Sequence, residues 1–131
     1  MRILLDSHIF IWAKAASKKL KDAARAAIED PGNEVSISVA SAWELWVKHA
    51  KVPITPILDG GPSAFMAAAR QSKITLLEIS LDHAARAATL PMHHRDPFDR
   101  LLIAQAMHED MTLVTNDAVF DRYAGLRTLK T

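Results

Sequence analysis

The sequence predicts an α/β fold in which helices cover both faces of a central, mostly parallel sheet of four to five strands. Short apolar runs, typical of strands, alternate with longer segments whose apolar residues recur every three to four positions, as on helices. Proline, glycine and asparagine separate these segments. The 131 residues suffice for one hydrophobic core, so we expect a single domain over residues 1–131.

The first quarter of the chain predicts a strand followed by two helices. Residues 2–5 form an apolar run, and residues 7–15 predict a short helix capped by its own first residue or by Asp6. Ser17 is expected to cap a second helix over residues 18–29, because apolar residues recur there at helical spacing. A Pro-Gly-Asn turn ends that helix.

The middle of the chain predicts a second strand over residues 34–38 and a strongly patterned helix over residues 40–51. One face of this helix is expected to be apolar, with Glu44 on its flank; the apolar residues are Val39, Trp43, Trp46, Val47 and Ala50. Residues 53–61 predict a loop, and residues 62–72 a helix that begins with proline.

The rest of the chain repeats the alternation. We expect Ser80 and Asp96 to cap the two longer helices of this part, the second of which begins with proline. We expect a strand over residues 74–79, helices over residues 81–89 and 97–110, and a further strand over residues 111–115. A short helix over residues 116–125 and an edge strand over residues 126–129 complete the chain.

Composition excludes several classes of function. Sixteen Lys and Arg against fifteen Asp and Glu give a net charge of +1, so there is no general basic field for coating nucleic acid. Five cations between residues 14 and 25 are expected to form a solvated helix face. The absence of cysteine excludes disulfides, a thiolate nucleophile and a cysteine zinc site. No apolar run is long enough to span a membrane, and an acid at position 6 interrupts any signal peptide, so we expect a cytoplasmic protein.

Four acids are spaced so that the fold would gather them. Asp6 and Asp117 follow predicted strands, whereas Glu44 and Asp99 lie early in predicted helices. In a parallel sheet, strand carboxyl ends and the starts of the following helices share one edge. Carboxylates gathered there repel one another unless a cation lies among them, and Mg²⁺ or Mn²⁺ favours such oxygen ligands.

Each of these acids also has a structural explanation. Asp6 and Asp117 are candidate helix caps, and Asp99 lies at the third helical position, where a carboxylate can complete a capping box. Glu44 can pair with Lys48 one helical turn later. Taken singly, each acid is better explained by these roles; taken together, the set favours a metal site.

Four blocks of sequence carry a further indication: Leu4-Leu5-Asp6-Ser7-His8, Ser41-Ala42-Trp43-Glu44-Leu45, the run HRDPFDRLLIAQA from His94 to Ala106, and Leu113-Val114-Thr115-Asn116-Asp117. In order and spacing they resemble the signature blocks of PIN domains. More narrowly, they resemble those of the VapC-type ribonuclease toxins of bacterial toxin–antitoxin pairs. The resemblance covers nearly the whole chain and implies a three-layer α/β/α PIN-like fold.

The resemblance assigns roles to particular residues. Ser7 corresponds to the small hydroxyl after the first acid, and Thr115 to the hydroxyl before the last one. Asp96 competes for the place of the third acid, but we assign it mainly to capping. The family's four catalytic acids correspond to Asp6, Glu44, Asp99 and Asp117. By this resemblance, Asp6, Asp99 and Asp117 are expected to hold the metal. Glu44 is expected to help place the metal or to orient the attacking water.

The activity implied by the resemblance is that of a Mg²⁺-dependent endoribonuclease, in which Mn²⁺ can substitute. The metal would polarise the scissile phosphate and activate a water for in-line attack, leaving 5′-phosphate and 3′-hydroxyl ends. The implied partners are the RNA substrate, a cognate antitoxin whose tail covers the site, and a second copy of the chain in a homodimer.

Cations and aromatic residues near these blocks leave alternatives open. Arg95 and Arg100 could hold phosphates or only balance the acids. His8, His93 and His94 could touch substrate or metal, but loop histidines are more often merely solvated, which is the interpretation that we favour. The tryptophans Trp12, Trp43 and Trp46 could stack on bases, but helical spacing favours a place in the core or a subunit interface.

Three other functions fit the sequence less well. A phosphoryl-transfer enzyme of the haloacid-dehalogenase type needs a second acid two residues after Asp6, where this chain has His8. A receiver domain needs paired acids near the first strand and a late lysine, neither of which is evident. A non-catalytic PIN-like module that binds RNA or protein would be expected to lack one of the four acids, and all four are present.

Overall fold

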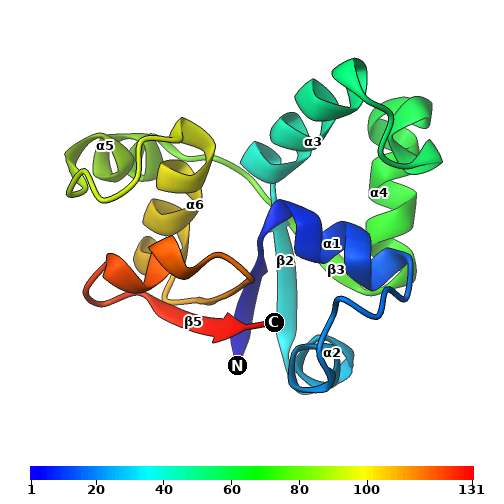
Figure 1. Cartoon of the computed structure of the whole chain (residues 1–131), viewed down its shortest axis with the longest axis horizontal. Helices are drawn as coiled ribbons and strands as arrows, with labels where there is room; N and C mark the ends of the chain where they lie inside the picture. The colour runs from blue at the N-terminus through cyan, green and yellow to red at the C-terminus, as the bar shows by residue number, and fades with distance from the viewer.

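Five parallel strands form one sheet in the computed structural model, which describes residues 1–131 (Figure 1). The strand order is β3-β2-β1-β4-β5, and every neighbouring pair is parallel. The strands are β1 (Arg2–Leu5), β2 (Glu34–Ser38), β3 (Ile74–Leu77), β4 (Thr112–Thr115) and β5 (Arg127–Lys130). The sheet is thus wholly parallel, and the first strand lies at its centre.

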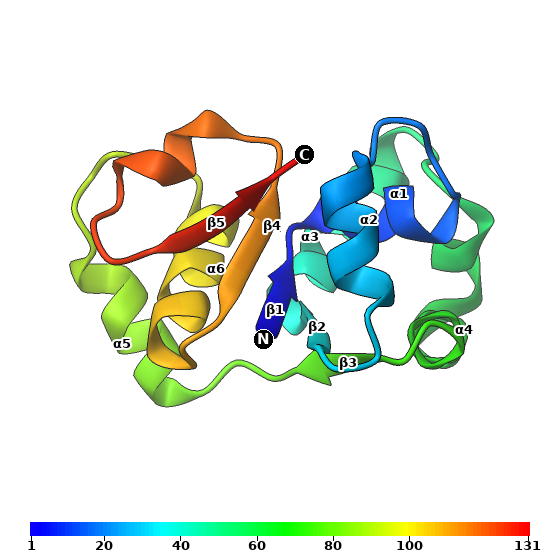
Figure 2. The same cartoon turned by 90° about the horizontal axis from the view of Figure 1, so that it is seen from below.

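Helices cover both faces of the sheet. In Figure 2, α1 to α4 lie on one side of the strands and α5 and α6 on the other, which gives the expected three-layer α/β/α architecture. The α-helices are α1 (Ser7–Lys14), α2 (Asp22–Glu29), α3 (Val39–Lys51), α4 (Gly61–Gln71), α5 (Leu81–Thr89) and α6 (Pro97–His108). Two short 3₁₀ helices, η1 (Pro56–Gly60) and η2 (Ala118–Arg122), complete the fold.

The core has two parts because strand side chains alternate between the faces of the sheet. Ile3 and Leu5 of β1 pack into a cluster with Phe10 of α1 on one face. Leu4 packs on the other face in a second cluster with Ile103 of α6. Each buried side chain of this size contributes roughly 1.5–3 kcal/mol, so β1 is fixed from both sides, and the residue after it is fixed with it.

The second helix begins later than the sequence pattern predicts. It starts at Asp22 rather than at residue 18, and no side chain caps it. The Ser17 hydroxyl instead accepts from the N–H of Lys19 in a turn, and Arg25 donates to the carbonyl oxygens of Ser17 and Leu20. Local side-chain hydrogen bonding thus competes with helix formation at this point.

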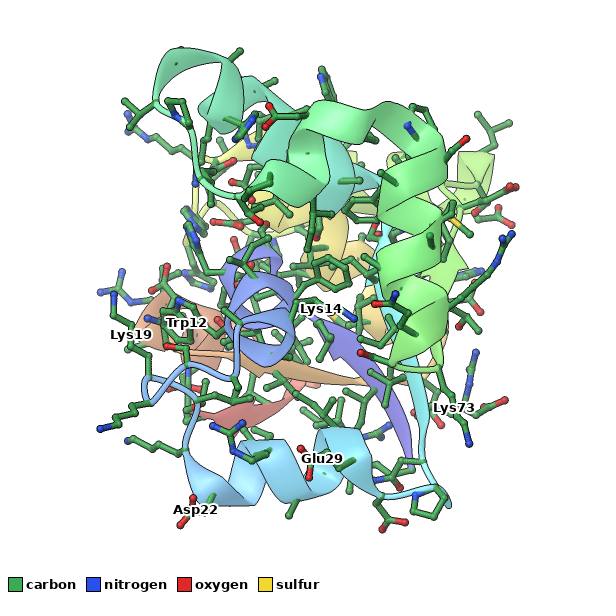
Figure 3. All side chains as sticks on the ribbon, turned by 90° about the vertical axis from the view of Figure 1, so that its right-hand side faces the viewer. Trp12, Lys14, Lys19, Asp22, Glu29 and Lys73 are labelled. Atoms are coloured by element: carbon green, nitrogen blue, oxygen red, sulfur yellow. The ribbon has the colours of Figure 1, made fainter.

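The five cations between residues 14 and 25 do not share one helix face, contrary to the prediction. Lys14 ends α1 and donates to the Ser72 hydroxyl at 2.9 Å, and Figure 3 shows it directed toward α4. Lys19 lies in the following turn, 5.7 Å above the ring of Trp12. Figure 3 shows Lys19 and Trp12 together on the side of α1 away from α4, above α2.

The third helix turns a different face inward from the one predicted. Ser41, Glu44 and Leu45 are buried, whereas Trp43 is 59% exposed and Val47 is 38% exposed. Of the two places predicted for Trp43, the core is therefore wrong, whereas a subunit interface stays a prediction. The reason is that Ser38 caps α3 directly at the end of β2, so the helix begins at the sheet edge and its polar flank packs toward α1 and α6.

Several boundaries differ by one or more residues from those predicted. β3 ends at Leu77 rather than at residue 79, and α6 ends at His108, after which Asp110 turns with φ +56° into β4. The predicted loop over residues 53–61 and short helix over residues 116–125 contain the 3₁₀ helices η1 and η2. No helix in the structure has the length and apolar character needed to cross a membrane.

Candidate metal centre

One edge of the sheet gathers the acids because every strand runs in the same direction. β1 ends at Leu5 and is followed by Asp6, and β4 ends at Thr115, two residues before Asp117. β2 leads directly into α3, whose second turn carries Glu44. α3 also packs against α6, whose first turn carries Asp99, and Figure 1 shows these two helices meeting beyond the strand ends.

Asp6 is held in one orientation by both of its carboxylate oxygens. Oδ1 accepts from the backbone N–H of Ser7 at 2.8 Å, which makes Asp6 the N-cap of α1. Oδ2 accepts from the Thr115 hydroxyl at 2.8 Å. The carboxyl is only 9% exposed, and this burial raises its pKa, although the hydrogen bonds from Thr115 and Ser7 act in the opposite direction.

The Thr115 hydroxyl has a fixed direction. It is fully buried, accepts from the backbone N–H of Asp117 at 3.1 Å, and therefore points its proton at Asp6. One threonine thus joins the residues that follow β1 and β4. The sequence signal for this contact is the hydroxyl two positions before the last acid.

Glu44 is buried beside Asp6 and is held by a second hydroxyl. The Ser7 hydroxyl donates to Glu44 Oε1, and Lys48 lies 3.4 Å from Oε2. The pair between Glu44 and Lys48 is the one expected from their helical spacing. Because Lys48 is half-exposed while Glu44 is buried, the lysine neutralises only part of the charge at this edge.

Asp99 shows the crowding of charge most clearly. Burial and then the nearby carboxylates of Asp6, Asp96 and Glu44 raise its pKa to about 7, although the hydrogen bond with His94 acts in the opposite direction. His94 Nε2 lies 2.6 Å from Asp99 Oδ2. The His94 Nδ1 atom accepts from the backbone N–H of Asp96, so the neutral ring carries its proton on Nε2 and donates it to Asp99.

The predicted acids form two groups that share one member. Ligand atoms of Asp6, Glu44 and Asp99 all lie within 4.8 Å of one another. Ligand atoms of His94, Asp99 and Asp117 form a second group with the same spacing. Asp117 is exposed and caps η2 through the N–H of Val119, so it reaches the buried acids only by way of Asp99.

The supporting residues proposed from the sequence occupy different environments. Asp96 caps α6 by accepting from the N–H of Phe98 at 2.9 Å. Arg95 is exposed, with no ion pair or side-chain hydrogen bond in the structure. Arg100 donates to four backbone carbonyl oxygens between residues 87 and 94, so its guanidinium fixes that loop and is not available for a phosphate.

His94 was expected to be solvated, and the structure contradicts this. Its ring is 21% exposed, and its backbone N–H donates to the hydroxyl of Tyr123, which in turn donates to the carbonyl oxygen of Pro91. The contact with Asp99 depends on how residues 91–96 fold back over α6. The only local signal was a histidine two residues before the acid that caps that helix.

A third group of potential ligands is explained without a metal. His83, His108 and Glu109 lie within the same spacing, but His83 Nδ1 accepts from the N–H of Ser80 in the capping box of α5. The His83 proton must then lie on Nε2, which donates to Glu109 at 2.9 Å. Both nitrogen atoms are thereby occupied, so the group serves to cap a helix.

The donor set at the sheet edge suits a hard divalent cation. It consists of carboxylate oxygens, which Mg²⁺ and Mn²⁺ prefer. Burial, together with the neighbouring carboxylates, raises the pKa values of Asp6 and Asp99. A divalent ion among Asp6, Glu44 and Asp99 would relieve this repulsion. Such a centre can bind a phosphate oxygen and activate water.

Comparisons with known proteins agree in placing the chain. The family model described as the PIN domain matches residues 3–126. Ribonuclease VapC22 of Mycobacterium tuberculosis is 33% identical over 119 residues, which cover 88% of this chain and 86% of that protein.

Solved structures share the fold over almost the full length. The VapBC2 complex of Rickettsia felis, bound to a DNA fragment from its promoter, matches with a TM-score of 0.74 and 21% identity, over 100% of this chain and 99% of that one. The DNA-bound VapBC complex of Salmonella typhimurium matches with a TM-score of 0.70 and 17% identity, over 99% and 98% of the two chains.

Proposed function

The chain belongs to the PIN-domain family and, within it, to the VapC-type ribonucleases, and from this premise we propose that it is a Mg²⁺-dependent endoribonuclease that acts as a toxin. One observation carries the proposal. Ligand atoms of Asp6, Glu44 and Asp99 lie within 4.8 Å of one another in a buried setting. Charged carboxylates this close together repel one another, and a divalent cation among them offsets that repulsion, as a metal-dependent ribonuclease requires.

The acids and hydroxyls of the chain would hold the metal in a defined place. Asp6, Glu44 and Asp99 would be its ligands, with Asp117 adding a further oxygen beside Asp99. A bound Mg²⁺ or Mn²⁺ ion would supply Lewis-acid polarisation of the phosphodiester and a lowered pKa for water.

The hydroxyls limit how far the ligands can move. Thr115 directs its proton to Asp6, and Ser7 directs its proton to Glu44, so each of these two carboxylates is held in one orientation by a hydroxyl. Asp99, with a pKa of about 7, keeps its proton in the metal-free site up to near-neutral pH and gives it up when a cation is bound.

The biological role proposed here follows from the relatives. Several relatives of known structure are solved as complexes of VapB with VapC, two of them bound to DNA. We therefore assign this chain a cognate antitoxin, as well as a homodimeric basic unit. An antitoxin tail with arginine or lysine could pair with Asp6, Asp99 and Asp117 and exclude the metal, because charge-assisted hydrogen bonds in a desolvated cleft are strong.

The direct test is cleavage of RNA by the purified protein. We expect cleavage with Mg²⁺ or Mn²⁺, none with a chelator, and none by Asp6→Asn even at saturating metal. The Leu81→Ala variant is the control, because Leu81 is an exposed residue of α5 outside the acidic edge. RNA cleavage that persists in the chelator, or in Asp6→Asn, would mean that the acids are not the catalytic centre.

The toxin role is tested by growth. Induction of the parent chain should arrest growth, whereas Asp117→Ala should not, and co-expression of the neighbouring gene should restore growth with the parent. If Asp117→Ala arrests growth as effectively as the parent, toxicity does not come from this site.

A further inference from the structure

A groove of about 490 Å³ lies directly beside the acidic cluster. One wall is the second half of α3, with Val47 and Lys51, and the other is the segment that enters α6, with Arg95 and Phe98. Glu44 belongs to both the groove and the acidic cluster. A ligand in this groove therefore reaches the reacting centre, and the volume lies within the range of about 300–1,000 Å³ typical of ligand pockets.

An exposed aromatic edge borders the groove. Trp43 precedes Glu44 on α3 and leaves 59% of its surface exposed, although it is among the largest apolar residues of the chain. Its ring meets that of Phe98 edge to face, with centroids 4.9 Å apart and planes at 73°. Phe98 supports the indole from one side, so a flat indole surface stays in place for a ligand.

Two of the three cations that line the groove are free to bind an anion, whereas Lys48 pairs with Glu44. Neither Lys51 nor Arg95 makes an ion pair or a side-chain hydrogen bond in the structure, and both are exposed. They lie on opposite walls, beside a cluster that by itself repels phosphate. Free cations together with an exposed aromatic face are the combination that binds single-stranded nucleic acid, since bases stack and phosphates pair with the cations.

A second copy of the chain fits this surface less well. In a two-fold contact the same patch lies on both copies, so Lys51 and Arg95 of both copies would be buried together. The acids that line the groove are already engaged, Glu44 by Lys48 and Asp96 by the N–H of Phe98. Like charges brought together in an interface oppose association. An RNA strand is complementary to the same charges.

We propose that Trp43, supported by Phe98, is a stacking platform for an unpaired base of the RNA next to the scissile phosphate, and that Lys51 and Arg95 hold the backbone beside it. This inference rests on the proposed ribonuclease function. Because a base in a duplex cannot turn its face to Trp43, the platform would make the enzyme select single-stranded segments. The proposal thus gives Trp43, whose helical spacing predicts a place in the core or a subunit interface, a role in substrate specificity.

The experiment measures binding separately from cleavage. A fluorescein-labelled, short single-stranded RNA of random sequence is titrated with the protein in a chelator, and its anisotropy gives the dissociation constant. The parent should bind the strand more tightly than the same RNA annealed to its complement. Trp43→Ala should weaken single-strand binding roughly tenfold or more, as expected for the loss of one base–aromatic stack.

Matched variants separate stacking from other effects. Trp43→Phe should retain most of the affinity because an aromatic face remains, and Leu81→Ala should change nothing. Lys51→Ala should reduce the salt dependence of binding. Lys18→Ala is the matched control, because Lys18 is an exposed lysine that does not line the groove, and it should leave the salt dependence unchanged. With Mg²⁺ present, Trp43→Ala should raise KM for RNA while changing kcat little.

Three outcomes would overturn the platform. The first is equal affinity of Trp43→Ala and the parent for the single strand. The second is a lower affinity of Trp43→Ala than of the parent for an abasic RNA. An RNA without the base has already lost the stack on Trp43, so the substitution should cause no further loss of affinity. The third is a smaller mass for Trp43→Ala in light scattering, which would assign Trp43 to a subunit contact. Failure of the ribonuclease proposal is recognised separately, by a parent protein that cleaves no RNA with any divalent ion.

Discussion

Asp99 links the two groups of potential metal ligands at the acidic edge, because it is the residue that belongs to both. Its neighbour Asp96 offers a matched comparison, since Asp96 caps α6 and Asp99 faces Asp6 and Glu44. We expect Asp99→Asn to lower RNA cleavage more than about a hundredfold, the upper end of what changes around metal ligands cost. Asp96→Asn should largely preserve cleavage, because asparagine also caps helices well. Circular dichroism should show both variants folded; the opposite pattern of activity would reverse the two roles.

The pKa of Asp99 also predicts how metal-free stability varies with pH. The folded protein raises this pKa from 3.8 to about 7, so it binds the proton more tightly than the unfolded chain does. The free energy of unfolding should therefore fall as pH rises between about 4 and 7, by at most about 1.4 kcal/mol per pH unit. The raised pKa of Asp6 acts in the same direction.

Urea denaturation at several pH values, in a chelator, measures this dependence. Asp99→Asn has no titrating carboxyl at this position, so its stability should vary less over the same range. Saturating Mg²⁺ should remove the loss of stability in the parent, because the ion binds the deprotonated acid. A parent whose stability rises from pH 4 to 7 in the chelator would contradict the assignment.

How much of the site could be predicted from sequence differs from residue to residue. The positions of Asp6, Thr115 and Asp117 follow from strand ends, which any parallel sheet brings to one edge. His94 could not be predicted in this way, because its contact with Asp99 needs the loop of residues 91–96 to be closed by Tyr123 and Arg100. Contacts of this kind depend on tertiary packing and leave no periodic signal.

At the scale of elements, α3 shows where a hydrophobic pattern misleads. The count of apolar residues placed Trp43 and Val47 inward, but the buried face contains Ser41, Glu44 and Leu45. The helix begins at the end of β2 and packs against α6, so its polar flank meets the acidic edge while its aromatic flank borders the groove. A functional site thus reverses the usual relation between hydrophobicity and burial.

Gln105 joins three of the elements around this edge. It is fully buried in α6, accepts from the Ser38 hydroxyl that caps α3, and donates to the Glu78 carbonyl oxygen before α5. Gln105→Leu leaves these buried groups without partners, so the free energy of unfolding should fall by about 1–3 kcal/mol. Gln71→Leu, the same change at an exposed helix end, should alter it by less than about 0.5 kcal/mol. Urea denaturation measures both, and equal small effects would show that Gln105 does not hold the elements together.

For the molecule as a whole, metal binding should add to stability because it offsets repulsion among groups from both ends of the chain. At a free-ion concentration a hundredfold above its dissociation constant, Mg²⁺ or Mn²⁺ should raise the free energy of unfolding by about 2.7 kcal/mol. The melting temperature should rise accordingly in the parent and much less in Asp6→Asn. Equal shifts in both proteins would remove Asp6 from the metal site.

The central place of β1 has a consequence for synthesis of the chain. Asp6 is made almost first, but the hydroxyl of Thr115 that orients it lies 109 positions later, on the strand beside it. Ribosomes add about 5–20 residues per second, so Asp6 waits roughly 5–20 s for this partner. Until β4 has been translated, the nascent polypeptide holds only part of the cluster. We therefore expect the nascent chain to be inactive on the ribosome, and the proposed toxin role would leave the cell that interval in which to supply the antitoxin.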